Sequence, residues 1–465
     1  MLQTRAALLQ RSLDDTLFWR PDEAVSVITG SVFLRAAARV ASALPEAEFY
    51  LNLCRTPCGA AIAVAAAMLR GSPCILVTDH SEAGIAALLQ RFPGAHPIME
   101  SADERCTPFP HRTMADPAAA DADGAAPHNP ELSLDQVAII GVTSGSTGRP
   151  TLHAKSWGVL ERRNRAAAQV FGLGSDGTGL QRPVVASVSP THMYGMETTV
   201  LLPLHAGTIT WCAASVFPGD AAANLARAAL IAVPGRIAPA PVFITTPLHL
   251  GALVEAETPM PTLHAVISAT APLDAVLAGR AEALWQAPVL EIFGATEVGS
   301  IASRRTTQGE AWTLYPGISL EMGEGVTEVV VEGASRTALS DILETLPDGR
   351  FRLLARGSDI IKRGGRRASL AGLTSQLAAL KGVQDAAFLM PDPPRRGRGA
   401  TLRPVAFAVA PGQDPARLLA ALGERIEPAF LPRSIILLDR LPRNAMGKLP
   451  RDALVELWQA HGGAP

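Results

Sequence analysis

Short apolar runs alternate with longer amphipathic stretches over most of the chain. In the first hundred residues, helical patterns alternate with β-branched or apolar runs such as Cys74-Ile75-Leu76-Val77, which follows the turn-like Gly71-Ser72-Pro73. Residues 181–346 again mix apolar strands with helical stretches. Strands that alternate with helices are typical of layered sheets, so the pattern predicts an α/β fold.

The pattern also predicts where the chain divides. Residues 100–136 are rich in Ala, Asp and Pro, which indicates a long surface connection. Residues 353–365 carry glycines and charges between apolar runs, which suits a hinge. The residues that follow have the length of one small α+β domain. We therefore expect an N-terminal core domain over residues 1–357 and a small mobile domain over residues 358–465.

Composition restricts the class of protein. The chain has 465 residues, of which 48% are hydrophobic and 18% are charged, enough for a sizeable core. No apolar run reaches the roughly 18–20 residues of a membrane helix. The N-terminus lacks the apolar segment of a signal peptide. We therefore expect a cytoplasmic protein without a membrane span.

The five cysteines fit no common zinc or redox spacing. Cys54 and Cys58 are four residues apart, so that a helix would place them on one face. A metal site would explain the pair, but burial of two small apolar side chains explains it as well. We favour burial.

Charge is distributed unevenly. Residues from Gly349 to Pro465 contain 19 Lys and Arg against 9 Asp and Glu, a net charge of +10, while the whole chain has −2. This indicates an anionic partner such as nucleic acid, a phosphorylated cofactor or an acidic carrier protein, unless the surface is simply solvated. The basic residues lack the interleaved aromatic side chains of nucleic-acid binders, so we expect no nucleic acid.

A glycine-rich loop follows the apolar strand Val137-Ala138-Ile139-Ile140. It reads Thr143-Ser144-Gly145-Ser146-Thr147-Gly148-Arg149-Pro150. Glycines let the backbone approach a ligand closely, and successive N–H groups with Ser and Thr hydroxyls can surround an anion. No Gly-Lys-Ser/Thr closes the loop, so it is not a Walker A motif. We predict a phosphate-binding loop of another kind.

Several later segments carry side chains that suit a nucleotide site. A carboxylate such as that of Glu297 is a hard ligand for a hard cation. An acidic residue such as Asp341 can hold a ribose diol, or it can cap a helix. Taken alone, each segment would be interpreted as an ordinary turn or loop. In chain order, the segments are Pro190-Thr191-His192-Met193-Tyr194-Gly195, Ser268-Ala269-Thr270-Ala271-Pro272-Leu273, Ile292-Phe293-Gly294-Ala295-Thr296-Glu297, Ser340-Asp341, the stretch 355–365, and Leu441-Pro442-Arg443-Asn444-Ala445-Met446-Gly447-Lys448-Leu449-Pro450-Arg451.

Taken together and in this order, the segments resemble the motifs of the adenylate-forming superfamily. That superfamily includes acyl-CoA synthetases, aryl-acid ligases, luciferases and the adenylation domains of peptide synthetases. The resemblance implies a large layered α/β domain, with αβαβα layers and a small β-barrel, followed by a small mobile α+β domain. It also implies ATP and Mg²⁺ as cosubstrate and ion.

The resemblance implies a role for each matched residue. Thr296 would contact the α-phosphate, Glu297 would hold magnesium, Lys448 would be the adenylation lysine, and Lys362 would act in the second half-reaction. Ser358 would be the hinge, and the acyl pocket would include His192, Tyr194 and Gly195, with residues 246–250 as further candidates. The nucleotide would be bound by Thr143, Ser144, Gly145, Ser146, Thr147, Gly148, Lys155, Ala269, Thr270, Ala271, Phe293, Gly294, Asp341 and Arg356.

Some positions depart from the family's pattern. Thr151 stands where a lysine usually follows the loop proline, and we expect Lys155 to supply the missing charge. Thr151 and the altered turn at residues 268–273 favour a non-catalytic nucleotide-binding paralogue. The retained Glu297, Asp341, Arg356 and Lys448 favour an enzyme, an AMP-forming acid–thiol ligase.

The identities of the acid and of the acceptor are the most specific predictions. The short N-terminal part, together with Lys155-Ser156-Trp157 after the loop, resembles stand-alone ligases of aryl-polyene and xanthomonadin-type pigment pathways. These load a hydroxybenzoate-like acid onto an acyl carrier protein. We therefore expect a hydroxybenzoate as the acid and an acyl carrier protein as the acceptor. The alternative is an acyl-CoA ligase for an aryl or fatty acid.

Overall fold

The computed structural model describes most of the chain, in ranges with gaps between them. These are residues 4–21, 26–100, 112–113, 128–143, 151–173, 181–233, 236–237, 239–323, 327–332, 336–339, 341–356, 360–363, 366–391, 403–443 and 449–462. Contacts divide the chain into an N-terminal unit, Met1–Leu320 with Val329–Thr337, and a C-terminal unit, Glu321–Glu328 with Ala338–Pro465. The hinge between residues 357 and 358 stays a prediction.

The first sheet of the N-terminal unit has the strand order β10-β9-β5-β4-β6-β7. All neighbouring strands are parallel except β9 and β10, which form an antiparallel pair on either side of the glycine-rich loop. The strands are β4 (Phe49–Asn52), β5 (Cys74–Leu76), β6 (Ala95–Met99), β7 (Arg112–Thr113), β9 (Val137–Thr143) and β10 (Thr151–Ser156).

The second sheet has nine strands in the order β19-β18-β17-β16-β15-β11-β12-β2-β3. Its central strands are parallel, so their carboxyl ends lie at one edge, where open α/β sheets bind ligands. The strands are β2 (Thr16–Trp19), β3 (Val27–Thr29), β11 (Arg182–Ala186), β12 (Thr208–Trp211), β15 (Val242–Thr245), β16 (Ala265–Ser268), β17 (Val289–Ala295), β18 (Gly299–Arg305) and β19 (Thr313–Leu314).

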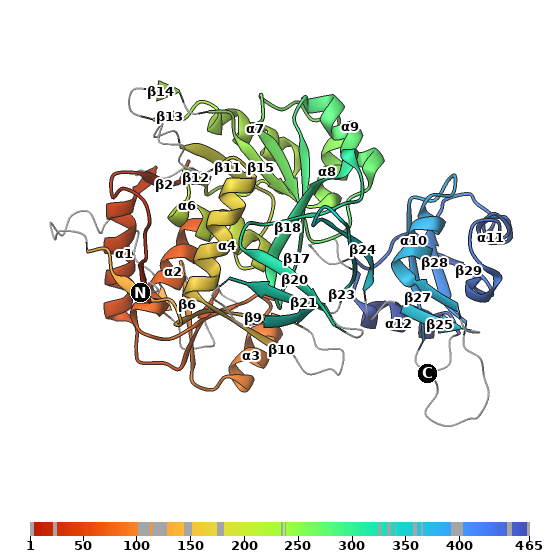
Figure 1. Ribbon diagram of the computed structural model, residues 1–465, viewed down its shortest axis with the longest axis horizontal. Helices are drawn as coiled ribbons and strands as arrows, with labels where there is room; N and C mark the ends of the chain where they lie inside the picture. Colours follow the sequence, from red (N-terminus) through yellow and green to blue (C-terminus); the bar gives the residue numbers. More distant parts are fainter. Residues whose placement is uncertain are drawn as a thin grey trace. The chain divides into compact units, whose positions relative to one another are not determined.

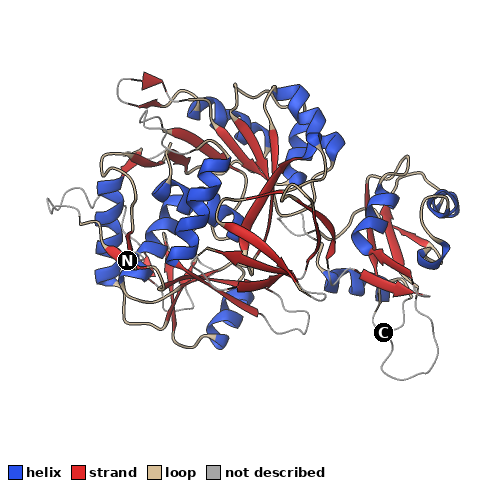
Figure 2. Ribbon diagram, in the orientation of Figure 1, coloured by secondary structure: helices blue, strands red, loops and turns tan. Residues whose placement is uncertain are grey.

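Helices cover both sheets and fill the space between them (Figures 1 and 2). The helix α2 (Pro57–Leu69) is apolar on all sides, and it contacts strands of both sheets. It shares one core with α1 (Gly30–Ala43), α4 (Trp157–Val170) and α6 (Leu202–His205). Side chains of α3 (Glu82–Arg91) pack with the first sheet in a separate cluster, and those of α7 (Pro218–Ala228), α8 (Pro247–Glu255) and α9 (Ala275–Trp285) pack with the second. The expected αβαβα layering is confirmed.

Smaller elements lie outside the two main sheets. They include two pairs of short strands and a three-stranded sheet, β20-β21-β22, whose residues fall partly in each unit. These elements are β1 (Arg5–Ala7), β8 (Glu131–Ser133), β13 (Ala232–Val233), β14 (Arg236–Ile237), β20 (Ile318–Met322), β21 (Thr327–Val331), β22 (Arg336–Leu339), α5 (Met193–Gly195), the π-helix η2 (Met196–Leu201) and the 3-10 helix η3 (Thr306–Gln308). The small β-barrel stays a prediction.

The C-terminal unit is the small α+β structure that the sequence predicts. Its sheet β27-β28-β29 packs with two helices around a core that includes Leu377, Phe388 and Leu422. Two hairpins precede it. The elements are β23 (Asp341–Thr345), β24 (Phe351–Arg356), β25 (Ile360–Arg363), β26 (Arg366–Ser369), α10 (Leu370–Ala378), β27 (Asp385–Leu389), β28 (Val405–Val409), α11 (Pro415–Gly423), η5 (Pro428–Phe430), β29 (Ile435–Leu437) and α12 (Arg451–Ala460).

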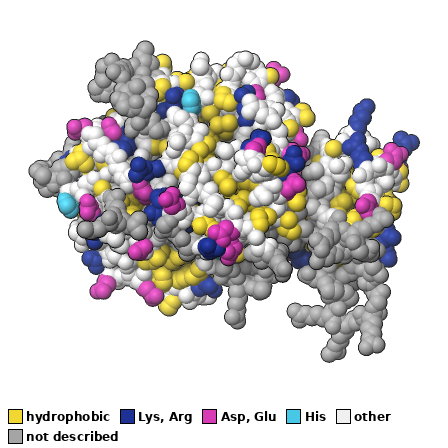
Figure 3. Space-filling model, in the orientation of Figure 1, with side chains coloured by type: hydrophobic (Ala, Val, Ile, Leu, Met, Phe, Trp, Pro, Cys, Tyr) yellow, Lys and Arg dark blue, Asp and Glu magenta, His cyan; other side chains and the backbone are white. Residues whose placement is uncertain are grey.

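Three simpler expectations concern membrane, metal and surface. Among the helices in the described ranges, none has the length and apolar character needed to cross a membrane. Cys54 and Cys58 are both buried, and within these same ranges no cluster of His, Cys, Asp and Glu side chains could hold a metal. On the face shown in Figure 3, acidic and basic side chains of the N-terminal unit are interspersed.

Candidate active site

Two segments that are far apart in sequence meet at the carboxyl ends of the strands. A Cβ atom at Gly141, on β9, would lie 2.8 Å from Cγ2 of Thr296, so the close approach requires glycine. Thr296 and Glu297 lie in the turn between β17 and β18, and both are partly exposed. The strand that enters the glycine-rich loop thus passes directly beside a hydroxyl and a carboxylate. The loop residues 144–150 lie outside the described ranges, and of Thr143 only the backbone is described.

Lys155 is held beneath this turn. The side chain is 4% exposed, and its Nζ donates a hydrogen bond to the backbone carbonyl of Glu297. Burial lowers the pKa of Lys155 to about 8, and Arg163 acts in the same direction, while Glu197 and Glu297 oppose them. Lys155 therefore positions the Glu297 turn. Direct contact with a triphosphate stays a prediction.

The turn that follows β16 is strained and firmly fixed. Thr270 has a positive φ of 83°, which a β-branched residue adopts only under constraint. The backbone N–H of Leu273 donates to Oε1 of Glu291 at 2.9 Å, and Arg304 forms a 2.7 Å ion pair with the same carboxylate. These contacts fix the end of the turn at Leu273, and the nucleotide-binding role of residues 269–271 stays a prediction.

The predicted aromatic segment lies next to this edge. Phe293, on β17, packs against Trp312 with ring centroids 5.4 Å apart, and Gly294 follows it. A Cβ atom at Gly294 would lie 2.4 Å from the carbonyl oxygen of Gly299, so the hairpin between β17 and β18 closes only with glycine here. The nucleotide-binding role of Phe293 stays a prediction.

The predicted pocket residues have different positions. His192 precedes α5 and is half-buried, while Gly195 is packed so tightly that a Cβ atom would lie 1.9 Å from the carbonyl oxygen of Ser189. The hydroxyl of Tyr194 donates to the backbone carbonyl of Ile267 at 2.8 Å, so it fastens this segment to β16. In the further candidate segment, Thr246 caps α8 by accepting from the N–H of His249.

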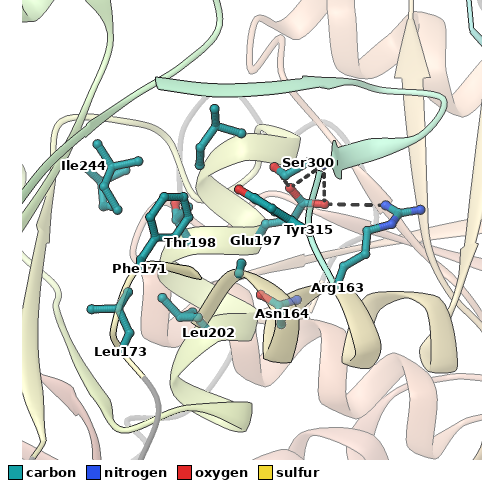
Figure 4. Close-up of a pocket in the computed structure, with 13 residues that line it drawn as sticks. Arg163, Asn164, Phe171, Leu173, Glu197, Thr198, Leu202, Ile244, Ser300 and Tyr315 are labelled. Atoms are coloured by element: carbon teal, nitrogen blue, oxygen red, sulfur yellow. Dashed lines mark hydrogen bonds and ion pairs between the residues drawn. The ribbon is translucent and has the colours of Figure 1, made fainter. Parts of the chain in front are cut away.

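A narrow cavity opens beside these residues, between α4, η2 and the strands of the second sheet (Figure 4). Its volume is about 20 Å³, which gives room for one or two water molecules. An organic acid would therefore enter only when lining side chains shift. Most of the wall is apolar, and a few polar side chains gather at one part; the lining residues are Arg163, Asn164, Ala167, Phe171, Leu173, Glu197, Thr198, Leu202, Ile244, Ile267, Ile292, Ser300 and Tyr315.

A buried ion pair forms the polar part of the cavity. Arg163 Nη1 lies 3.7 Å from Glu197 Oε1, and both side chains are less than a tenth exposed. Burial lowers the pKa of Arg163, and Glu197 opposes that shift. The N–H of Ser300 donates to Glu197 Oε2 at 3.2 Å, and its hydroxyl donates to the same oxygen (Figure 4). The neighbouring Gly299 has φ +72°, and a Cβ atom there would lie 2.0 Å from Arg163 Nη1.

Tyr315 contributes a buried hydroxyl that lacks a hydrogen-bond partner in the described part of the chain. Its ring packs edge-on against Phe171, with centroids 6.0 Å apart. Burial raises the pKa of Tyr315 well above its ordinary value, and the nearby Glu197 adds to the shift, so the hydroxyl stays protonated and is a donor. A buried donor without an acceptor costs roughly 1–3 kcal/mol, which a ligand can recover.

Sequence reasoning missed these polar lining residues for a physical reason. Arg163 lies in the charged run Glu161-Arg162-Arg163-Asn164-Arg165, which has the composition of a solvated helix face. Glu197 offered a better indication, because it is the only charged residue in the otherwise apolar stretch 193–204. A lone acid in such a stretch needs a buried partner.

The C-terminal unit contains the other predicted residues. Asp341 is 6% exposed and lies directly opposite Arg356 in the hairpin of β23 and β24. Lys362 is on β25. The side chains of Arg356 and Lys362 are outside the description, and so are the residues Ser358 and Lys448. Their predicted roles stay predictions.

Comparisons with known proteins agree with this geometry. Residues 58–332 match the family model described as AMP-binding enzyme. A 4-coumarate–CoA ligase of Rhodobacter capsulatus is 30% identical over 285 residues, which cover 61% of this chain and 66% of that ligase.

Two solved structures share the fold. ATP-bound MatB from Rhodopseudomonas palustris has a TM-score of 0.78 at 18% identity, over 96% of each chain. The o-succinylbenzoate CoA synthetase of Bacillus subtilis, in complex with its acyl-adenylate, has a TM-score of 0.77 at 18% identity, over 97% of this chain and 98% of that one.

Proposed function

The chain belongs to the AMP-binding enzyme family, that of ATP-dependent, AMP-forming acid–thiol ligases, and from this premise we propose that it activates a hydroxybenzoate-type aryl acid and transfers it to an acyl carrier protein. The observation that carries the proposal is the mainly apolar cavity with a few polar side chains, whose wall includes Ile292 of β17 and Ser300 of β18, the two strands that the Thr296–Glu297 turn connects. Pockets of this composition bind small organic ligands.

ATP and Mg²⁺ fit the residues that are present. The missing side chain at Gly141 leaves the strand before the glycine-rich loop in contact with Thr296, whose hydroxyl can donate to a phosphate oxygen. The Glu297 carboxylate beside it is the type of ligand that Mg²⁺ prefers. When bound, the ion would neutralise part of the charge on the phosphates.

In the first half-reaction, a carboxylate oxygen of the acid attacks the α-phosphorus of ATP. The bond from that phosphorus to the bridging oxygen breaks, and pyrophosphate leaves. Two anions must approach each other, so the chain has to supply positive charge and hydrogen-bond donors at this point. Thr296, the N–H groups of the loop and Lys448 would do so, while Lys155 keeps the Glu297 turn in place.

In the second half-reaction, a thiol attacks the carbonyl carbon of the acyl-adenylate. The bond between that carbon and the AMP oxygen breaks, so a thioester and AMP form and the thiol proton is released. A rotation of the predicted mobile domain, residues 358–465, about Ser358 would bring Lys362 and its loop to the site for this step. This alternation would let one site catalyse two different reactions.

The acid and the acceptor are supported by different observations. Phe171 and Tyr315 contribute aromatic rings to the largely apolar cavity wall, which supports an aryl acid once lining side chains shift, and the relative described above is a 4-coumarate–CoA ligase. The net charge of +10 between Gly349 and Pro465 supports an acidic carrier protein as acceptor. Coenzyme A is the second candidate acceptor, because its phosphates would also suit this charge and the named relatives are CoA ligases.

One competition experiment tests the proposal. The enzyme is incubated with ATP, Mg²⁺ and 4-hydroxybenzoate, first alone and then with equal concentrations of coenzyme A and a pantetheine-bearing acyl carrier protein. Mass spectrometry should detect the aryl-adenylate without a thiol and the carrier-bound thioester when both thiols are present. Exclusive formation of the CoA thioester would replace the carrier protein by coenzyme A. Absence of any adenylate, with ATP bound, would favour the non-catalytic paralogue.

A further inference from the structure

The polar part of the cavity lacks one hydrogen-bonding partner. The Tyr315 hydroxyl is 1% exposed, lines the cavity and has no acceptor in the described part of the chain. Figure 4 shows the Tyr315 ring beside Glu197. Folded proteins rarely leave a buried hydroxyl donor without an acceptor, so an oxygen or nitrogen atom of a ligand is the expected partner.

The two charged groups of the ion pair in the same cavity do not form a direct hydrogen bond, which leaves a gap between them. The 3.7 Å between Arg163 Nη1 and Glu197 Oε1 exceeds the usual range of a hydrogen bond. Arg163 Nη1 and Nε have no hydrogen-bond partner among the described residues. Glu197, by contrast, already accepts from both donors of Ser300. A hydroxyl group is suited to this gap, because it can accept from the guanidinium and donate to the carboxylate.

The charges that line the cavity are balanced. The charged side chains in its wall are one cation, Arg163, and one carboxylate, Glu197, which form an ion pair. A substrate with a second carboxylate at this end would add an uncompensated buried charge, which is costly. A neutral hydroxyl adds no charge and satisfies the available donors and acceptor.

We propose that Tyr315 and the Arg163–Glu197 pair bind a ring hydroxyl of the acid, and that they thereby make the enzyme selective for a hydroxylated aryl acid. The inference rests on the function proposed above, and it assigns that specificity to named side chains. Tyr315 supplies a donor, Arg163 a second donor and Glu197 the acceptor. Ser300 and Gly299 are positioning residues. Ser300 donates hydrogen bonds to the Glu197 carboxylate, and the missing side chain at Gly299 leaves room for that carboxylate.

The test measures pyrophosphate release with benzoate, 3-hydroxybenzoate, 4-hydroxybenzoate and terephthalate. The wild-type enzyme should prefer one hydroxybenzoate over benzoate by roughly 10- to 100-fold in kcat/KM and should use terephthalate poorly. In Tyr315→Phe, the preference should fall by about tenfold, while kcat/KM for benzoate stays within about twofold. The thermal midpoint of the free enzyme should not fall, since the lost hydroxyl has no partner.

Tyr50→Phe is the matched control. Its buried hydroxyl donates to the backbone carbonyl of Pro45 at 2.7 Å and does not line the cavity, so the change should lower the thermal midpoint and leave the hydroxybenzoate preference intact. The inference is overturned if Tyr315→Phe slows all acids equally, if its midpoint falls as in the control, or if terephthalate is the best substrate. If the wild-type enzyme releases no pyrophosphate with any of these acids, the proposed function is overturned, and the inference with it.

Discussion

Gly299 shows how one residue connects the Thr296–Glu297 turn to the cavity. Its φ of +72° excludes an unstrained side chain, and a Cβ atom would lie 2.0 Å from Arg163 Nη1 and 2.5 Å from Glu197 Oε1. The turn that carries Thr296 and Glu297 therefore ends on the buried ion pair. A change at this glycine would be transmitted to both.

We expect Gly299→Ala to lower both stability and adenylation. Gly71→Ala is the control, because Gly71 has a similar φ of +78° but nothing within 4 Å of the added atom. In the control, added backbone strain alone should lower the free energy of unfolding, by about 1–2 kcal/mol. Urea unfolding should show a clearly larger loss of this free energy for Gly299→Ala, and the acid-dependent pyrophosphate release of that variant should drop. Equal unfolding free energies for the two variants would show that the ion pair does not constrain this position.

At the residue scale, the sequence offered candidates in exposed polar turns more readily than among buried side chains. Thr296, Glu297 and the residues of the 269–271 turn could be selected because their types and order match a phosphate- and nucleotide-binding pattern. Arg163, Glu197 and Tyr315 could not, because their importance comes from being buried together by segments more than thirty residues apart. No local sequence pattern indicates that these three side chains lie close together.

The contact between α4 and α6 contains a largely buried titratable group, His205. His205 ends α6, and its ring lies 5.0 Å from that of Trp157, the first residue of α4. Burial lowers the pKa of His205 from its ordinary 6.5 to about 3, and Arg165 adds to the shift. The unfolded chain therefore binds a proton between these two pH values that the folded protein does not bind.

This predicts a specific acid sensitivity. As the pH falls from about 6.5 toward 3, His205 should reduce the free energy of unfolding by roughly 1.4 kcal/mol per pH unit. His205→Leu removes the group, so the difference between wild type and variant should change with pH in this range and stay constant above pH 7. Denaturant unfolding at a series of pH values measures it. Parallel curves from pH 4 to pH 8 would contradict the assignment.

At the element scale, the alternating pattern was a good guide where strands and helices are regular. The run at Cys74–Leu76 and the strand that enters the glycine-rich loop are both found, in one sheet. The π-helix Met196–Leu201, which continues α5 into α6, was not predicted. Its turns place Glu197 and Thr198 in the cavity wall, and wider helical turns of this kind occur often at functional sites.

At the scale of the whole molecule, the two units have separate cores, and this permits movement of one relative to the other during catalysis. The family resemblance assigns the hinge to Ser358. We expect Ser358→Pro to block thioester formation and spare adenylate formation, because proline fixes φ. Ser358→Ala should support both steps. Separate assays of pyrophosphate release and thioester yield test this, and loss of both steps in the proline variant would refute the hinge assignment.

Acid-dependent pyrophosphate release tests the central claim most directly. Wild-type enzyme with ATP and Mg²⁺ should release pyrophosphate only when a suitable acid is added, with an aryl acid preferred over fatty acids. Lys448→Ala should reduce the rate by about 10²–10³-fold and leave ATP binding largely intact, while Lys381→Ala, at an exposed position, should have no effect. Silence with every benzoate, hydroxycinnamate and fatty acid, while ATP still binds, would contradict the account.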